Sequence, residues 1–218
     1  MRFFSIAILI IGSFITAIAQ KDSTNLVKYD YSFSFKEGIY PDFNSFRNND
    51  PIPLEAIISP EYSDDFYNML DTTKHIVYYG KFGSSISVPV RNIWGYSKNG
   101  KPYILWADKF NLIPFVGQIT HFVTTVTVYY SSYQDPFYNS YQYNSYSRGY
   151  QSEELRQFII DMQTGKIIDY NLNNIETILK RDTETYNEFM KLRKRKRSKQ
   201  MFYYVKLYNE KKPLYIPE

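Results

Sequence analysis

The stretch "IWGYSKNGKPYILW", from Ile93 to Trp106, predicts a β-hairpin. Asn99-Gly100 stands between two runs of apolar and aromatic residues, and both residues tolerate the positive φ that a two-residue hairpin turn requires. We therefore expect antiparallel strands at 92–98 and 102–107. A hairpin of this kind needs further strands or helices to cover it, because an isolated pair is only marginally stable in water.

Other segments on both sides of this hairpin show the patterns of strands. They lie at 27–35, 75–81, 86–91, 118–130, 155–162 and 167–170. The segment 27–35 alternates strictly between apolar and polar residues, which indicates one buried and one solvated face. Both faces of 118–130 are apolar or β-branched, which predicts a strand inside the sheet. Gly165 predicts a second hairpin turn between the last two strands.

Helical patterns occur near both ends of the chain. Two short helices are expected at 42–49 and 60–70, and two more at 175–181 and 184–209. Asn173 or Asn174 would cap the third, and Asp182 or Thr183 the fourth, which is long and ends before Pro213. The expected fold class is therefore α+β: a mainly antiparallel β-sheet with short N-terminal helices and C-terminal helices packed on it.

Composition excludes several classes of protein. The chain has 218 residues, of which 44% are hydrophobic and 19% aromatic, so a packed core is expected. It contains no cysteine, which excludes a disulfide scaffold, cysteine metal sites and a thiol nucleophile. The formal net charge of +4 is too small to indicate nucleic-acid binding by the whole protein.

The N-terminus has the pattern of a secretory signal peptide. Arg2 is followed by an apolar run from Phe3 to Ala19 that ends in a small-x-small cleavage pattern. The alternative is an uncleaved membrane anchor, since the run is long for a signal core and short for a span. We expect a signal peptide at 1–19, one α+β domain over 20–218 and no later transmembrane segment. Location in the periplasm or at the cell surface argues against chemistry with ATP, NAD or nucleic acid.

A tyrosine-rich stretch separates two of the expected strands. Eight tyrosines fall within 129–150, among Ser, Asn, Gln, Asp, Gly and Pro. Mixtures of Tyr, Ser, Asn and Gly are typical of recognition loops, and loops of about 20 residues are usually functional or disordered. A loop at about 131–150 is therefore either a binding surface or a mobile insertion. The candidate partner-binding residues are Tyr133, Tyr138, Tyr141, Tyr143 and Tyr146.

A cationic run lies within the expected long helix. Seven of the nine residues from Lys191 to Lys199 are Lys or Arg. A solvated helix segment is one interpretation, and contact with lipid phosphates or an anionic polysaccharide is another. Nucleic acid, which such runs often bind, is a poor partner for an exported protein. The candidate partner-binding residues are Arg193, Lys194, Arg195, Lys196 and Arg197. The apolar residues on both sides of the run should dock on the sheet or on a partner.

Motifs for catalysis, cofactors and metals are missing from the sequence. His75 and His121 are the two histidines, and they fall in separate expected strands, where a local hydrogen bond would satisfy each. Asp64-Asp65 fits a helix start better than an acid–base pair. Trp94 and Trp106 flank the hairpin and are expected to pack in the core or at an edge, with a sugar platform as the sharper alternative. We expect no catalytic residue, no cofactor and no metal.

Four stretches taken together resemble a known group of proteins. They are "GIYPDFNSFRNNDPI" (38–52), "IWGYSKNGKPYI" (93–104), "GKIIDYNLNNIETILKRDTETYNEFMKLRKRKR" (165–197) and "YNEKKPLYIP" (208–217). In these stretches the chain resembles uncharacterised exported proteins of Bacteroidetes-type bacteria. The resemblance implies the envelope of a Gram-negative bacterium as the location and a variable tyrosine-rich interruption. It implies no activity, cofactor or catalytic residue.

The sequence leaves three functions open. The first is a non-enzymatic envelope protein that binds a protein or polymer partner through the tyrosine loop or the basic helix. The second is an exported hydrolase acting on glycans or peptides, with two carboxylates converging in a cleft. The third is a membrane-surface protein held by the basic C-terminal helix. The oligomeric state and the identity of the partner do not follow from the sequence.

Overall fold

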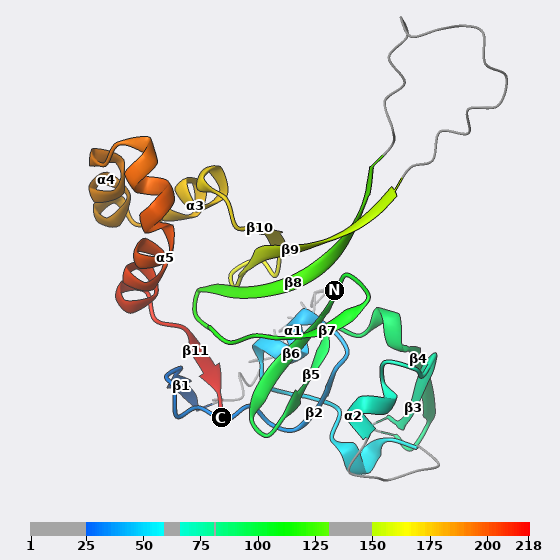
Figure 1. Ribbon diagram of the computed structural model, residues 1–218. Coiled ribbons are helices and arrows are strands. Elements are labelled where there is room, and N and C mark those ends of the chain that lie inside the picture. Colours follow the sequence, from blue (N-terminus) through cyan, green and yellow to red (C-terminus); the bar gives the residue numbers. More distant parts are fainter. Residues whose placement is uncertain (1–24, 59–65, 81, 131–149) are drawn as a thin grey trace, which may run out of the picture.

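The computed structural model describes residues 25–58, 66–80, 82–130 and 150–218 (Figure 1). These residues form short N-terminal elements, a series of antiparallel strands, and a C-terminal group of helices. The elements are β1 (Leu26–Lys28), β2 (Gly38–Tyr40), α1 (Phe43–Arg47), η1 (Leu54–Ala56), α2 (Phe66–Met69), β3 (His75–Tyr79), β4 (Ser85–Pro89), η2 (Val90–Asn92), β5 (Gly95–Lys98), β6 (Lys101–Trp106), β7 (Lys109–Leu112), β8 (Ile119–Tyr130), β9 (Tyr150–Asp161), β10 (Ile167–Asp169), α3 (Leu172–Leu179), α4 (Thr183–Lys191), α5 (Lys194–Lys211) and β11 (Tyr215–Pro217).

All strand pairs among the described residues are antiparallel, which confirms the α+β prediction. One sheet has the order β2-β5-β6-β7 and a second has the order β10-β9-β8. Two smaller pairs, β3-β4 and β1-β11, complete the arrangement. The two helices expected near the N-terminus are present as α1 and α2, although α2 begins at Phe66 and residues 60–65 of its expected range lie outside the described residues.

The two predicted hairpin turns are confirmed. Lys98 pairs with Lys101 across Asn99-Gly100, where φ is 53° and 70°. Gly165, with φ of 73°, turns the chain between β9 and β10. These positive φ values place both turns in the left-handed region, which glycine and asparagine enter at little steric cost.

Three clusters of buried side chains hold the layers together. The first lies between the four-stranded sheet and one face of β8–β9, where the Trp106 and Phe158 rings meet edge to face at 5.7 Å. The second joins α2 and the β3–β4 hairpin to the four-stranded sheet. The third joins the other face of β8–β9 to α3, α4 and α5, which confirms that the C-terminal helices pack on the sheet (Figure 1).

The strand predicted at 27–35 is wrong beyond its first residues. β1 ends at Lys28, and the chain then turns at Asp30, whose carboxylate accepts hydrogen bonds from the Ser32 N–H and hydroxyl at 2.8 and 2.6 Å. An aspartate that bonds the backbone two residues ahead stabilises a turn over an extended chain. The alternation fails accordingly, because Tyr31 is fully exposed while Phe35 is buried.

The single helix predicted at 184–209 is two helices. Leu192 and Arg193 are extended, with ψ of 144° and 147°, and they separate α4 from α5. A straight helix of that length would span about 39 Å, so its two apolar ends would lie too far apart to reach one cluster. The break folds α5 against α4, and both then pack into the third cluster.

The predicted caps are right for one helix and wrong for another. Asp182 caps α4, accepting a hydrogen bond from the Thr185 N–H at 3.0 Å. Asn171 caps α3 in place of Asn173 or Asn174, so the helix starts about one turn earlier than expected. An N-cap side chain satisfies one of the unpaired N–H groups of the first turn.

The prediction that the strand at 118–130 lies inside the sheet is wrong. This strand, β8, lies at one edge of its sheet. Its inner half is buried on both faces because the first cluster covers one face and the third cluster covers the other. Its outer half is increasingly exposed toward Tyr130. The apolar residues on both faces of β8 are therefore explained by the clusters that cover the two faces of the sheet. They do not require a neighbouring strand on each side of β8.

Candidate binding surfaces

The cationic run lies at the corner between α4 and α5. Lys191 ends α4, Leu192 and Arg193 form the extended connection, and the next cations occupy the first turns of α5. Leu192 is partly buried against the third cluster and anchors this connection. Six cations of the run are exposed, and we call them the cationic corner: Lys191, Arg193, Lys194, Arg195, Lys196 and Lys199.

Arg197 differs from the other predicted site residues. Its side chain is only 15% exposed, and its Nη1 lies 3.1 Å from Glu176 Oε1 in α3. The same nitrogen also donates to the Met190 sulfur at 2.6 Å. Arg197 therefore ties α5 to α3 and α4. Of the five predicted cations, Arg193, Lys194, Arg195 and Lys196 face solvent, and Arg197 does not.

No cation of the corner forms an ion pair within the described parts of the chain. At the start of α4, Glu184 binds Lys211 at 2.9 Å and Asp182 lies 3.9 Å from Lys212, while Glu188, one turn before Lys191, forms no ion pair with a described residue. The first turn of α5 has no acidic residue and no side-chain cap. Cations at a helix N-terminus are disfavoured by the helix dipole, by roughly 0.3–1 kcal/mol each at low salt. The corner thus carries unbalanced positive charge.

The charge of the whole chain is unevenly divided. Residues 172–212 contain twelve Lys and Arg against five Asp and Glu, a formal charge of +7. Since the total is +4, the remaining residues carry −3. The small net charge therefore conceals a strongly cationic helical part, and an approaching polyanion would be attracted to that side of the molecule.

Two aromatic side chains extend the cationic surface along α5. Arg195, Lys199, Phe202 and Lys206 lie at successive spacings of four, three and four residues, which places them on one face of a helix. Phe202 is 41% exposed and the adjacent Tyr203 is 60% exposed. The opposite face of α5 packs into the third cluster through Tyr204, Val205 and Tyr208. The apolar residues after the run were expected to dock on the sheet or on a partner, and those of this buried face pack into the third cluster, which includes residues of the sheet.

The predicted tyrosine site falls mostly outside the described residues. Tyr133, Tyr138, Tyr141, Tyr143 and Tyr146 lie in 131–149, which the structure does not describe. The described residues on either side of this segment form the outer half of β8–β9, which projects from the body as a two-stranded ribbon (Figure 1).

The outer half of this ribbon carries exposed apolar side chains. Tyr129 is 74% exposed and Leu155 is 76% exposed, on one face. On the other face the rings of Tyr130 and Tyr150 stack at 5.1 Å, and the Tyr130 hydroxyl donates to Glu154. Tyrosine combines a large contact area with a polar tip, which suits it to partner binding.

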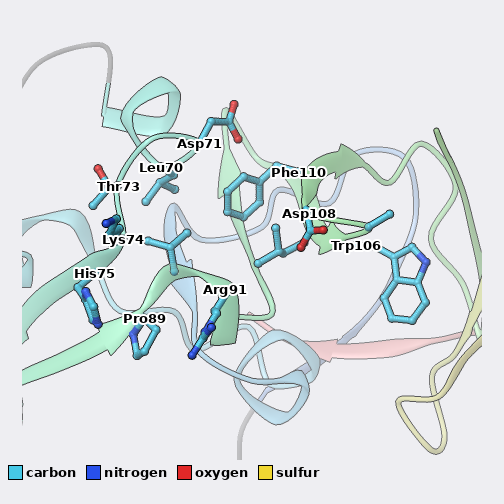
Figure 2. A pocket seen from close by; sticks show the side chains of 13 residues that line it. Leu70, Asp71, Thr73, Lys74, His75, Pro89, Arg91, Trp106, Asp108 and Phe110 are labelled. Carbon is cyan, nitrogen blue, oxygen red and sulfur yellow. The ribbon is translucent and has the colours of Figure 1, made fainter. Parts of the chain in front are cut away.

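An open cleft of about 750 Å³ lies between the loop after α2, the start of β3, η2 and the β6–β7 turn (Figure 2). Its apolar lining includes Leu70, Val90 and Phe110. Its polar rim consists of Asp71, Thr73, Lys74, His75, Arg91 and Asp108. In Figure 2 Asp71 and Asp108 lie on opposite sides of the Phe110 ring, and the cations lie apart from both. The polar groups of this cleft do not converge on one point.

The two histidines are not brought together. His75 is exposed at the start of β3, on the rim of the cleft. His121 is buried in β8, where its Nε2 lies 3.0 Å from Gln157 Oε1 and its ring contacts Tyr170 and Phe202. Burial lowers the pKa of His121, so its ring is neutral at pH 7.

Other chemistry is likewise not assembled in the described residues. They contain no group of three or more His, Cys, Asp or Glu placed to hold a metal ion. Trp94 stacks on Phe46 at 4.0 Å and Trp106 packs against Phe158, which confirms the expected core or edge packing, and Trp106 also lines the cleft. Within the same residues, no helix has the length and hydropathy needed to span a membrane.

Comparison of the chain with protein-family models, curated proteins and solved structures finds no match. The sequence predicted Arg193, Lys194, Arg195, Lys196 and Arg197 as binding candidates, and the first four of these are exposed. It missed the exposure of Phe202 and Tyr203, although their spacing from Lys199 and Lys206 is the signal that would have found them.

Proposed function

We propose that this chain is a non-enzymatic, exported protein of the cell envelope that binds an anionic partner through the cationic corner. The observation that carries the proposal is the set of six exposed cations without an ion-pair partner among the described residues. Four of the six, Arg193, Lys194, Arg195 and Lys196, lie at the N-terminus of α5, where the helix dipole disfavours cations, so their concentration there costs folding free energy. A loss of folding free energy of this kind is typical of binding residues. An anion bound at the start of α5 would offset it.

Placement of the corner supports the same proposal. The corner stands on α4 and α5, which are fixed to the sheet by buried side chains such as Phe189 and Val205. A charged surface on a rigid support loses little conformational entropy on binding. The electrostatic attraction is long-ranged at low salt and screened at high salt, so binding should fall steeply as salt is added.

A hydrolase is not proposed. A glycan hydrolase needs two carboxylates that converge in a cleft, one of them with a raised pKa. Asp71 and Asp108 share the cleft, but in Figure 2 they lie on opposite sides of Phe110. The pKa of Asp161, the most buried described aspartate, is lowered, which is opposite to the need of a general acid.

The test measures binding to inorganic polyphosphate, a simple polyanion. We compare the mature protein with the variant Arg195→Glu/Lys196→Glu by fluorescence anisotropy of labelled polyphosphate. The wild type should bind, with affinity falling at least tenfold between about 50 and about 200 mM salt. The variant should bind at least about tenfold more weakly, because two attractive charges become repulsive.

A matched control makes the same change of net charge elsewhere. Lys101 in β6 and Lys166 before β10 are exposed and form no ion pair with described residues. Lys101→Glu/Lys166→Glu should leave polyphosphate binding within about twofold of wild type, since neither residue is near the corner. Equal losses in both double variants would mean that net charge alone is responsible, and the proposal would fail.

The β8–β9 ribbon supports a second surface, for a protein partner. Tyr129 and Leu155, both about three-quarters exposed, lie on the same face of the two paired strands. Site-specific photo-cross-linking from position 129 in intact cells, compared with position 101, tests it. A discrete cross-linked species from position 129 alone is expected, and identical patterns from both positions would refute this surface.

A further inference from the structure

We propose that the anionic partner of the cationic corner is a phospholipid surface, and that Phe202 and Tyr203 enter its headgroup region. This inference rests on the proposed function and narrows it to one class of partner. It is drawn from the exposed face of α5, where cations and aromatic rings lie on the same side of one helix.

The geometry is that of a helix lying on an interface. Arg195, Lys199 and Lys206 alternate along the exposed face with Phe202, and Tyr203 lies beside it. Clusters of Lys and Arg bind anionic headgroups electrostatically, and aromatic rings beside them add contact at headgroup depth. The aliphatic stems of the cations can lie along the surface while their charged ends reach the phosphates. In Figure 1 α5 lies at the outer side of the molecule, away from the four-stranded sheet.

Phe202 and Tyr203 are what separate a lipid from a dissolved polyanion. A soluble polyanion needs cations only, and it leaves two aromatic rings exposed to water. The interface of a bilayer accepts both features, since aromatic rings with a polar tip or edge settle at headgroup depth. The Phe202 ring packs against the rings of Phe115 and His121, at 5.2 and 5.6 Å between ring centres, so its position is fixed and only its exposed part, 41% of the residue, is open to contact.

The rest of the charge distribution favours one orientation. The residues outside 172–212 have a formal charge of −3 in total, against +7 for residues 172–212. An anionic surface attracts the helical part and repels the remainder. The acidic residue on the exposed face of α5 is Glu210, in the last turn, far from the corner.

The experiment compares two probes with three proteins. Vesicles of phosphatidylethanolamine with phosphatidylglycerol are used for co-sedimentation, vesicles of phosphatidylcholine alone serve as the uncharged reference, and polyphosphate is measured as above. The proteins are wild type, Phe202→Ser/Tyr203→Ser, and Tyr129→Ser/Leu155→Ser. The last is a matched control because its two side chains are at least as exposed, but on the ribbon.

The wild type should bind the phosphatidylglycerol vesicles and not the uncharged ones. Phe202→Ser/Tyr203→Ser should bind them about tenfold more weakly and keep its polyphosphate affinity, because the lost contacts are apolar. The ribbon variant should match wild type with both probes. Tyr203→Ser alone, which removes a ring that is 60% exposed, should show a smaller loss and covers the case in which Phe202→Ser disturbs packing.

A direct reporter completes the test. Phe202→Trp should shift its emission to the blue on the anionic vesicles and be quenched by brominated lipid, while Trp94 and Trp106 should not respond, because both pack within the first cluster. No quenching, or equal vesicle binding by the serine variants, would overturn the lipid inference and leave polyphosphate binding to support the proposed function. If Arg195→Glu/Lys196→Glu changes binding to neither probe, the proposed function itself is wrong.

Discussion

The C-terminal helices carry two groups of cations on opposite sides. On the inner side Arg181 contacts Asp161 through two hydrogen bonds of 2.8 and 2.7 Å, and Arg197 contacts Glu176 at 3.1 Å. On the outer side the cations of the corner have no acidic partner among the described residues. The inner cations connect helices to the sheet and to each other, and the outer ones do not.

The difference shows that charge alone does not identify a binding residue. Arg195 and Arg197 are two positions apart in one run, yet one is exposed and the other is 15% exposed. An ion pair that is partly buried contributes to stability mainly because removing one partner leaves the other unsatisfied. An exposed, unpaired cation adds no stability to the fold, and at the start of a helix it lowers the stability slightly. Substitutions should therefore separate the two groups by their effect on unfolding.

The largest effect is expected from Asp161→Ala. Asp161 is 5% exposed, and besides Arg181 it accepts hydrogen bonds from the Thr164 hydroxyl at 2.7 Å and the Gln163 N–H at 3.1 Å. Its loss leaves Arg181 without its partner and weakens the β9–β10 turn. The free energy of unfolding in urea should fall by about 3 kcal/mol. Asp169→Ala, at an exposed aspartate of β10, should change it by less than about 0.5 kcal/mol.

Acid should remove the stabilisation that the Asp161 carboxylate gives to the folded protein. Burial raises the pKa of Asp161, but hydrogen bonds from Arg181, Thr164 and Gln163 outweigh it, so the pKa is lowered from 3.8. A carboxyl whose pKa is lower in the folded state stabilises the protein above about pH 4, and this stabilisation is lost as the pH falls through the folded value. Asp161→Ala should therefore show a shallower fall in stability below about pH 4 than wild type. Parallel curves in urea titrations would contradict the assignment.

Arg197→Ala should have the next largest effect and no effect on polyphosphate binding. It removes the contact with Glu176 and the packing of the aliphatic stem between helices, so the free energy of unfolding should fall by about 1–2 kcal/mol. A double-mutant cycle with Glu176→Ala isolates the pair, and the coupling should be about 1 kcal/mol. If Arg197→Ala is as stable as wild type but binds polyphosphate more weakly, Arg197 acts like the exposed cations of the corner. The contrast between the two groups of cations would then be wrong.

Local signals in the sequence predicted much of this fold. Asn99-Gly100, Gly165 and Asp182 each act within a few residues, so their hairpin turns and helix cap were found correctly. Features that depend on distant partners were missed. The pairing of β1 with β11 joins Val27 to Ile216, and no local pattern indicates it.

The candidate site divides in the same way. Exposure of Arg193 to Lys196 follows from consecutive cations that no helix can bury together. The role of Arg197 depends on Glu176, 21 residues earlier in another helix, and on the break at Leu192, which packing imposes. Helical periodicity separates the buried Tyr204 and Val205 from the exposed Phe202 and Tyr203, because Lys199 and Lys206 mark the exposed face.

The smallest expected effect has the opposite sign and tests the outer group most directly. Arg195 lies in the first turn of α5, where the helix dipole favours an anion and where the described structure has no acidic residue. Arg195→Glu should therefore raise the free energy of unfolding by about 0.5 kcal/mol while weakening binding to polyphosphate. Arg195→Gln should give about half of each change, and thermal unfolding at low salt is the suitable measurement because added salt screens the effect. A loss of stability in Arg195→Glu would mean that Arg195 has a structural partner, and the corner would then no longer differ from the inner cations.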